Sequence, residues 1–302
     1  MKKIGKNSKL YIIGMIVGGI TLGLTTVIAD TIINSTNVAY KTTTVKAALD
    51  ELYGLADLKS ILILEDAGSH NSIYRGKDVT SYYTDGSLYT RISSGKFTDL
   101  FVGDYIVKNG VNWRIAGFDI YYGKGDIALT SHHAVIVPDT NLTTAVMNDT
   151  NVTTGGYVGS KMYTTTLPSV LTTYITPVFG SHVLEYRNSL TTSVNTSIYN
   201  RFGTNSGATN GWGWQMRKLD LMNENQVTGS IEWSSSGLET GTDNVQFPLF
   251  RLKPEFVNKQ RSWYWLRNVT SSSAFAGINN NSASIYNNAS NSGGVRPCFY
   301  ID

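Results

Sequence analysis

The chain has 302 residues, 16% of them charged, and a formal net charge of +3 at pH 7. Four lysines in residues 1–9 supply four positive charges to a segment, 1–29, that contains no Asp, Glu or Arg, so the remainder carries 3 − 4 = −1. A near-neutral body excludes a nucleic-acid-binding function, and the replacement of charged residues by Asn, Ser, Thr, Gly and Tyr is typical of an extracellular binding surface rather than of a cytosolic enzyme.

The first predicted element is an apolar run of 20 residues from Leu10 to Ala29, which follows the basic start. As a helix this run extends about 30 Å, the hydrocarbon thickness of a bilayer. The basic residues before it should stay in the cytoplasm, which places the C-terminal bulk outside. We expect an uncleaved membrane anchor. The alternative is a cleaved signal peptide and a secreted protein, because Val27 and Ala29 resemble a cleavage site before Asp30.

Residues 30–63 are predicted to form a stalk that contains a short amphipathic helix. Its apolar residues recur at helical spacing: Val45, Ala48, Leu49, Leu52 and Leu55. A single apolar stripe on so short a helix does not fold alone. The helix should therefore pack either on the following domain or on copies of itself, and the second arrangement gives a homo-oligomer.

Residues 64–302 are predicted to form one α+β domain of mostly antiparallel strands, a few short helices and long loops such as 148–160. Strands are expected within 61–69, 87–94, 101–110, 111–122, 134–139, 230–236, 246–252, 262–269, 274–278 and 294–301. Asn109-Gly110 predicts a tight hairpin between two of these strands.

Two helices are predicted in the middle of this domain. The first covers 167–179, with Pro168 in its first turn and Pro177 at its end. Its buried face should consist of Val170, Leu171, Tyr174, Ile175 and Val178. The second helix is expected to begin at Asp220 and to stop near Gly229.

No catalytic residue, metal ligand or cofactor is predicted. Cys298 is the single cysteine, which excludes an internal disulfide, and its alternating apolar surroundings favour a small buried hydrophobe. His132 and His133 are adjacent, so on a strand they point to opposite faces, and structural hydrogen bonding is expected rather than a zinc site. An enzyme that uses His132, His133 and Asp139 remains the least favoured alternative.

Segments spread in order along the domain resemble one known family. They are 68–80 (GSHNSIYRGKDVT), 97–106, 112–119, 132–140, 147–162, 179–188, 247–256, 263–269 (WYWLRNV) and 289–299 (ASNSGGVRPCF). Together they resemble the target proteins of diversity-generating retroelements of gut bacteria and their phages. The resemblance implies a C-type-lectin-like fold, which formylglycine-generating enzymes share. The chemistry of those enzymes needs paired cysteines, and this chain has one.

The resemblance also implies a hypervariable ligand-binding tip at 271–294. The positions that resemble diversified ones are Gly277, Asn279, Asn280, Asn281, Ser284, Tyr286, Asn287, Asn288, Asn291 and Gly293. The candidate framework residues around them are Phe275, Ala276, Ile278, Ala283, Ala289, Ser290, Val295 and Pro297. Asn residues are poor strand formers but good hydrogen-bonding surface, and Trp263, Trp265, Phe275 and Phe299 should supply the core beneath them.

Two binding functions are therefore expected from the sequence. The first is a surface-displayed receptor or adhesin whose ligand is a cell-surface protein or glycan. The second is a phage tail-associated receptor-binding protein, in which the stalk drives oligomerisation. The membrane segment departs from what a virion protein needs, so it favours the bacterial envelope. Cys298 also departs from the family, since it stands where a small residue is expected.

Overall fold

The computed structural model describes residues 39–40, 43–44, 66–194, 209–234 and 245–302. The chain divides into two units, Met1–Leu64 and Glu65–Asp302. In the first unit, β1 (Ala39–Tyr40) and β2 (Thr43–Thr44) pair as an antiparallel ladder. The predicted membrane segment and stalk helix lie outside the described residues. Within the ranges that the structure describes, no helix has both the length and the apolar character needed to cross a membrane.

The second unit is a mixed α+β domain with mostly antiparallel sheets. Its helical segments are α5 (Ala67–His70), α6 (Thr80–Thr84), α7 (Ser87–Ser93), the π-helix η1 (Met162–Thr166), α8 (Leu167–Val170), the π-helix η2 (Leu171–Ile175), α9 (Thr176–Phe179), the 3-10 helix η3 (Gly180–His182), α10 (Glu224–Thr228), α11 (Pro248–Leu252) and the 3-10 helix η4 (Pro254–Phe256). Its strands are β3 (Tyr105–Lys108), β4 (Val111–Phe118), β5 (Ala134–Pro138), β6 (Thr143–Ala145), β7 (Tyr186–Val194), β8 (Thr209–Arg217), β9 (Leu219–Leu221), β10 (Tyr264–Val269), β11 (Ala274–Ile278), β12 (Ser284–Asn288), β13 (Gly293–Val295) and β14 (Pro297–Ile301).

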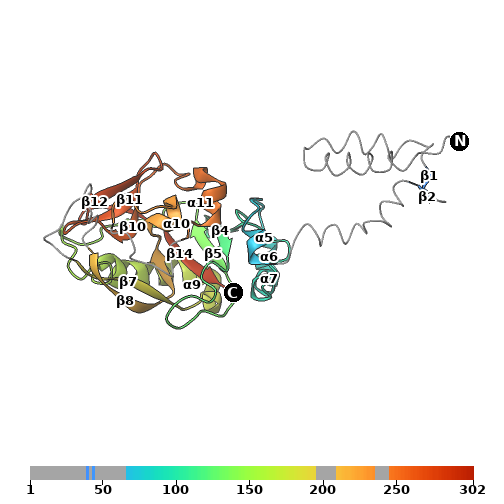
Figure 1. The fold of residues 1–302 in the computed structure, drawn as a ribbon, viewed down its shortest axis with the longest axis horizontal. Coiled ribbons are helices and arrows are strands. Elements are labelled where there is room, and N and C mark those ends of the chain that lie inside the picture. Colours follow the sequence, from blue (N-terminus) through green and yellow to red (C-terminus); the bar gives the residue numbers. More distant parts are fainter. Residues whose placement is uncertain (1–38, 41–42, 45–65, 195–208, 235–244) are drawn as a thin grey trace, which may run out of the picture. The chain divides into compact units, whose positions relative to one another are not determined.

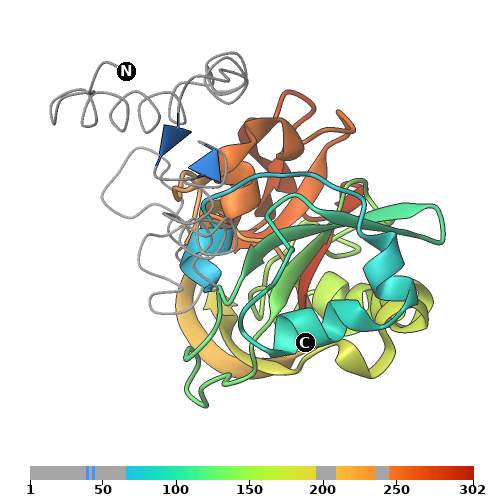
Figure 2. The same cartoon turned by 90° about the vertical axis from the view of Figure 1, so that its right-hand side faces the viewer.

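Two larger sheets organise this unit. One has the strand order β3-β4-β5-β14-β9 and the other β12-β11-β10-β13-β6, while β7 and β8 form a separate ribbon. Among the named strands of the described residues, every pairing is antiparallel except that of β10 with β13. In Figure 1, β10, β11 and β12 lie at one end of the unit, and α5, α6 and α7 lie at the other. Figure 2 looks at that second end, where the cyan helices stand in front of the green and red strands.

The chain passes from one sheet to the other at Arg296, between β13 and β14. The Arg296 side chain is buried. Its guanidinium donates to the backbone oxygens of Pro138 at 2.8 Å, Val257 at 2.7 Å and Phe256 at 3.1 Å. Because a buried cation must be compensated by hydrogen bonds, these three carbonyls fix the junction between the sheets.

The structure confirms the strands predicted in 101–110, 111–122, 134–139, 262–269, 274–278 and 294–301. The hairpin between β3 and β4 turns at Asn109 and Gly110, whose φ angles are 52° and 75°. Positive φ at both central residues is the geometry that favours Asn-Gly in a two-residue turn. The segment 148–160 is loop and turn, as expected.

Three predicted strands are wrong. The segments 87–94 and 246–252 contain the helices α7 and α11. Leu88 and Ile92 stand one helical turn apart and are fully buried, and Pro248 occupies the first turn of α11. The segment 230–234 is bent rather than extended. The backbone N–H groups of Glu232, Trp233 and Ser234 all donate to the carboxylate of Glu224, and not to a neighbouring strand. The predicted turn at 66–69 forms the start of α5.

The two predicted helices exist with different bounds. Helical structure runs from Met162 to Phe179, with π-helical turns at both η1 and η2. Pro177 lies in the first turn of α9 rather than at a helix end, and α9 ends at Phe179, where the 3-10 helix η3 follows. The second helix, α10, starts at Glu224, whereas Asp220 belongs to β9.

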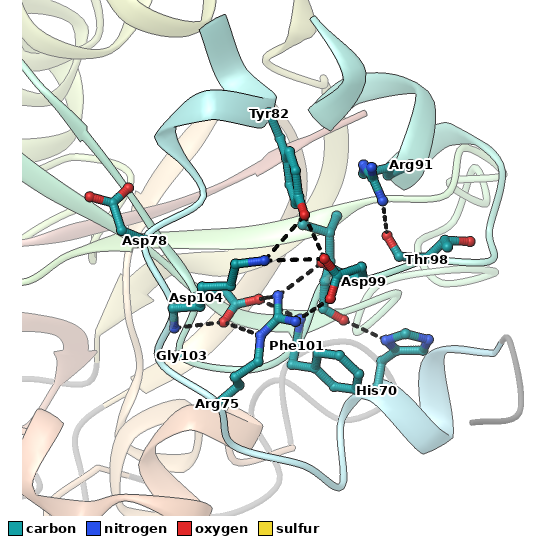
Figure 3. Close-up of polar contacts among 12 residues, drawn as sticks. His70, Arg75, Asp78, Tyr82, Arg91, Thr98, Asp99, Phe101, Gly103 and Asp104 are labelled. Atoms are coloured by element: carbon teal, nitrogen blue, oxygen red, sulfur yellow. Dashed lines mark hydrogen bonds and ion pairs between the residues drawn. The ribbon is translucent and has the colours of Figure 1, made fainter. Parts of the chain in front are cut away.

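A charged cluster ties together the end of the unit that carries α5, α6 and α7 (Figure 3). Arg75 donates to the buried carboxylate of Asp104 at 2.6 Å and is ion-paired with Asp99. Asp99 also accepts from Lys77 at 3.2 Å and from the Tyr82 hydroxyl at 2.5 Å. Partial burial alone would raise the pKa of Asp99, but the hydrogen bonds from Tyr82, Arg75 and Lys77 outweigh it and lower that pKa. The cluster therefore holds Asp99 ionised.

Candidate ligand-binding tip

The predicted tip contains the hairpin β11–β12, in which a buried strand supports a partly exposed one. β11 is buried along its whole length, and β12 pairs with it as the edge strand of its sheet. The register joins Ala274 to Asn288 and Ile278 to Ser284. The sequence predicted that the Asn-rich tract is poor strand material, but part of it is a strand, because Ile285 and Tyr286 lie in its centre and β11 supplies the ladder partners.

Asn279 builds the turn of this hairpin. Its Oδ1 accepts hydrogen bonds from the backbone N–H groups of Asn281 at 2.8 Å and Ala283 at 3.0 Å. Its backbone oxygen accepts from the side chain of Asn258 at 2.7 Å. This is the local bonding for which Asn is favoured in turns. The side chain of Asn279 therefore has a structural role, and Asn280, next to it, is exposed.

The ten predicted positions differ in exposure. Asn280, Asn281, Tyr286, Asn288 and Asn291 are exposed, Asn279, Ser284 and Asn287 are half-buried, and Gly277 and Gly293 are buried. Side chains alternate along a strand, so Ser284, Tyr286 and Asn288 share one face of β12, and Asn287 lies on the other. The Asn287 Oδ1 accepts from the Asn291 side chain at 3.3 Å. The exposed positions thus gather on the edge strand, its turn and the loop that follows.

Gly277 and Gly293 do not belong to the exposed surface. A Cβ at Gly277 would lie 2.8 Å from the backbone oxygen of Tyr264. A Cβ at Gly293 would lie 2.8 Å from Trp265 Nε1 and would overlap the ring of Trp263. Both glycines permit close approach of the chain to its neighbours. We therefore leave them out of the proposed binding surface.

Of the four aromatic residues predicted beneath the tip, Phe299 lies in the other sheet, where its ring packs on Trp113 and Phe179. Trp265, Phe275 and Phe299 are fully buried, and Trp263 packs against the core with its ring centroid 4.9 Å from that of Trp265. Trp265 Nε1 donates to the backbone oxygen of Ala145 at 3.0 Å, which joins β10 to β6. A closely packed core of this kind resists deformation, so it holds the hairpin in one position.

Two of the arginines in the family-like segments, Arg267 and Arg296, are buried close to β10 and β13. Arg267, in WYWLRNV, donates from Nη1 to the backbone oxygen of Leu221 at 2.8 Å. Arg296, in ASNSGGVRPCF, occupies the junction described above. Both arginines therefore hold the framework, and neither is a ligand-binding candidate.

Sequence reasoning missed two neighbours of the tip. Asn151 Oδ1 accepts from the N–H of Ser290 at 3.0 Å and from its hydroxyl at 2.7 Å. The Trp233 ring packs on Tyr286, with centroids 4.8 Å apart and planes inclined by 58°. Both contacts join segments far apart along the chain, so no local pattern points to them. The one available signal is that Trp233 is an aromatic residue in a polar segment.

The residues of the enzyme alternative are engaged in structural contacts. Asp119 accepts from the backbone N–H of His133 at 2.8 Å and lies 2.7 Å from His132 Nδ1. Asp139 forms a buried ion pair with Arg114 at 2.5 Å. Over the described ranges no three His, Cys, Asp or Glu side chains are grouped so as to hold a metal ion. Cys298 is buried, as predicted.

Comparison with known proteins adds no relative. No protein-family model, no curated protein and no solved structure matches the chain.

Proposed function

We propose that this chain is a surface-displayed receptor or adhesin that binds its ligand through a hypervariable tip on a C-type-lectin-like domain. The N-terminal segment anchors it in the membrane, and the ligand is a protein or glycan on another cell. The binding surface consists of Asn280, Asn281, Tyr286, Asn288 and Asn291, with Ser284 and Asn287 at its margin.

One observation supports this proposal above the others. Five of the ten positions that the family resemblance marks as variable are exposed, and they gather on the edge strand β12, its turn and the loop that follows, beside the fully buried strand β11. Binding residues are commonly placed on loops and edges that a rigid scaffold positions. The surface also lies at the end of the unit opposite α5, the first described element that follows the predicted anchor and stalk (Figure 1).

The chemistry of these side chains suits recognition. Asn amides donate and accept hydrogen bonds, and Tyr286 adds apolar area at a small entropic cost. Substitution of an exposed side chain leaves the buried framework unchanged, so the surface tolerates many sequences. Affinity for one copy is expected to be modest, and display of many copies on one cell raises the effective concentration.

The first test is sequencing of the DNA that encodes residues 265–300 across many cells of one population, together with a search for a nearby near-copy of that stretch. The proposal expects substitutions confined to adenines at the positions of the tip, within an invariant framework. A uniform sequence with no near-copy contradicts hypervariability and leaves a surface protein of fixed specificity.

The second test measures binding. Beads that carry the full-length protein are mixed with cells of the same microbial community, and bound beads are counted by flow cytometry. Tyr286→Ala and Asn288→Ala are expected to lower bead binding at least tenfold. Ser169→Ala, an exposed position on α8, is the control and should leave binding unchanged. Equal binding by all the variants contradicts a ligand site at the tip.

A further inference from the structure

Glu224 is a buried carboxylate that holds the segment 230–234. It is the first residue of α10, and its side chain is inaccessible to solvent. Its Oε1 accepts from the backbone N–H of Trp233 at 3.0 Å and of Glu232 at 3.3 Å. Its Oε2 accepts from the N–H of Ser234 at 3.2 Å and from its hydroxyl at 2.7 Å. A carboxylate buried away from water is tolerated because these donors compensate its charge.

The same carboxylate contacts the tip. The hydroxyl of Ser284, the first residue of β12, donates to Glu224 Oε1 at 3.2 Å. Asn268 on β10 reinforces the arrangement, since its Oδ1 accepts from the Glu224 N–H at 2.8 Å and its Nδ2 donates to the Ser234 hydroxyl at 3.1 Å. Glu224 therefore joins one helix, one loop and the exposed hairpin.

The aromatic contact lies directly beside this anchor. Trp233 is nearly buried, with 8% of its surface exposed, whereas Tyr286 is 42% exposed. Their rings pack together, and Tyr286 is two residues along β12 from Ser284, on the same face. The position of Trp233 relative to the tip is thus set by the backbone bonds that its own segment makes to Glu224.

We propose that Glu224 is a positioning residue that fixes segment 230–234 against β12, so that Trp233 forms an invariant flank of the ligand-binding surface beside the variable Tyr286. This inference rests on the function proposed above for the tip. The ligand then meets a composite surface, in which a hairpin that changes between variants abuts a loop that does not.

Burial and hydrogen bonding act in opposite directions on the pKa of Glu224, and the effect of burial is the larger. Desolvation raises the pKa of this carboxyl, and the hydrogen bonds from Ser234, Trp233 and Glu232 oppose that effect. A glutamine at this position has one acceptor oxygen and one NH₂ group. In either orientation of the amide, the NH₂ group faces backbone donors, so the replacement cannot keep all of the bonds.

The test is hydrogen–deuterium exchange of the full-length protein, read by mass spectrometry at residues 232–234. Glu224→Gln is expected to speed exchange of these amides at least tenfold. Glu185→Gln is the matched control, because Glu185 lies on the surface 3.8 Å from Lys218 Nζ, and it should leave the exchange unchanged. Ser284→Ala should also leave the loop amides unchanged, since it removes no hydrogen bond that the loop itself makes. Wild-type exchange in Glu224→Gln overturns the proposed anchor.

A second set of variants covers the case in which Glu224→Gln unfolds the domain, which faster exchange in β14 would reveal. Ser234→Ala then probes the same anchor from the loop and should speed exchange at residues 233–234 alone. If Ser234→Ala leaves these amides as in the wild type, the anchor is again overturned.

The role of Trp233 is read in the bead assay, where Trp233→Ala is expected to lower binding at least fivefold. Unchanged binding by Trp233→Ala, together with loss of binding by Tyr286→Ala, overturns the flank and leaves the tip function intact. Unchanged binding by both variants contradicts the tip function itself, and the exchange result then still decides whether Glu224 anchors the loop.

Discussion

Asn151 and Ser290 are joined by a paired contact in which one amide oxygen accepts from both the backbone N–H and the hydroxyl of the serine, at 3.0 and 2.7 Å. This contact ties the loop at 148–160 to the segment between β12 and β13. Asn151→Ala removes the acceptor of both bonds. The expected loss is about 1 kcal/mol of unfolding free energy, because each partly solvated bond contributes modestly.

Chemical denaturation of the two proteins measures this loss. Asn280→Ala is the control, since Asn280 is an exposed turn residue, and its effect should stay within about 0.5 kcal/mol. Equal stability of Asn151→Ala and the wild type would show that the contact adds nothing to the stability of the fold.

The sequence predicts best those elements whose signal is local. The turn at Asn109-Gly110 needs positive φ at two successive residues, and few dipeptides other than Asn-Gly meet that need easily. The strands β10, β11 and β14 are predicted correctly because their apolar residues do not also recur at helical spacing. The exposure of the tip follows in the same way from its Asn content.

Tertiary burial decides the elements that the sequence misassigns. In 87–94 the aromatic and β-branched residues favour a strand, but the core buries Leu88 and Ile92 and leaves Thr90 exposed. A strand would place Thr90 on the same face as Leu88 and Ile92, whereas the helix α7 turns it away from them. The start of α10 was detectable locally: Asn223 and Gln226 form a capping box, which puts Glu224 in the first turn. The hydrogen bond from Ser284 to Glu224 joins residues 60 positions apart in the sequence, so no local sequence pattern predicts it.

Gly293 allows β13 to pass against two tryptophans. A Cβ at this position overlaps the Trp263 ring and lies 2.8 Å from Trp265 Nε1. Gly293→Ala is therefore expected to cost about 1–3 kcal/mol of unfolding free energy, in the range of other overpacked cores. Thermal unfolding measures it, with Ser292→Ala at the neighbouring exposed position as control. A stable Gly293→Ala protein that still binds beads would return this residue to the set of variable positions.

Arg296 joins the sheets through three backbone carbonyls, at 2.7–3.1 Å. Lysine keeps the charge but concentrates its donors at one point, so Arg296→Lys cannot reach all three acceptors. Each buried carbonyl left unpaired costs about 1–3 kcal/mol, and we expect a loss of about 2 kcal/mol or more. Urea denaturation checks this value, and Arg251→Lys on the exposed side of α11 is the control. A loss equal to that of the control would show that the junction does not depend on the guanidinium.

The ionisation of Asp99 should make the free energy of unfolding depend on pH in the acidic range. Its pKa lies below the ordinary value of 3.8, since the hydrogen bonds from Tyr82, Arg75 and Lys77 outweigh the effect of its partial burial. A carboxyl with a lowered folded-state pKa adds stability that is fully present above its unfolded pKa and is lost as the pH falls through the folded value.

The wild type should therefore exceed Asp99→Asn in unfolding free energy most at pH values above about 4, and the two should converge in stronger acid. Denaturation curves collected from pH 7 to pH 2 test this trend. Asp149→Asn, which breaks a surface ion pair with Lys161, should differ little from the wild type throughout, because solvent screens exposed pairs. A difference for Asp99→Asn that does not change with pH would mean that Tyr82, Arg75 and Lys77 hold the neutral side chain as well as the charged one.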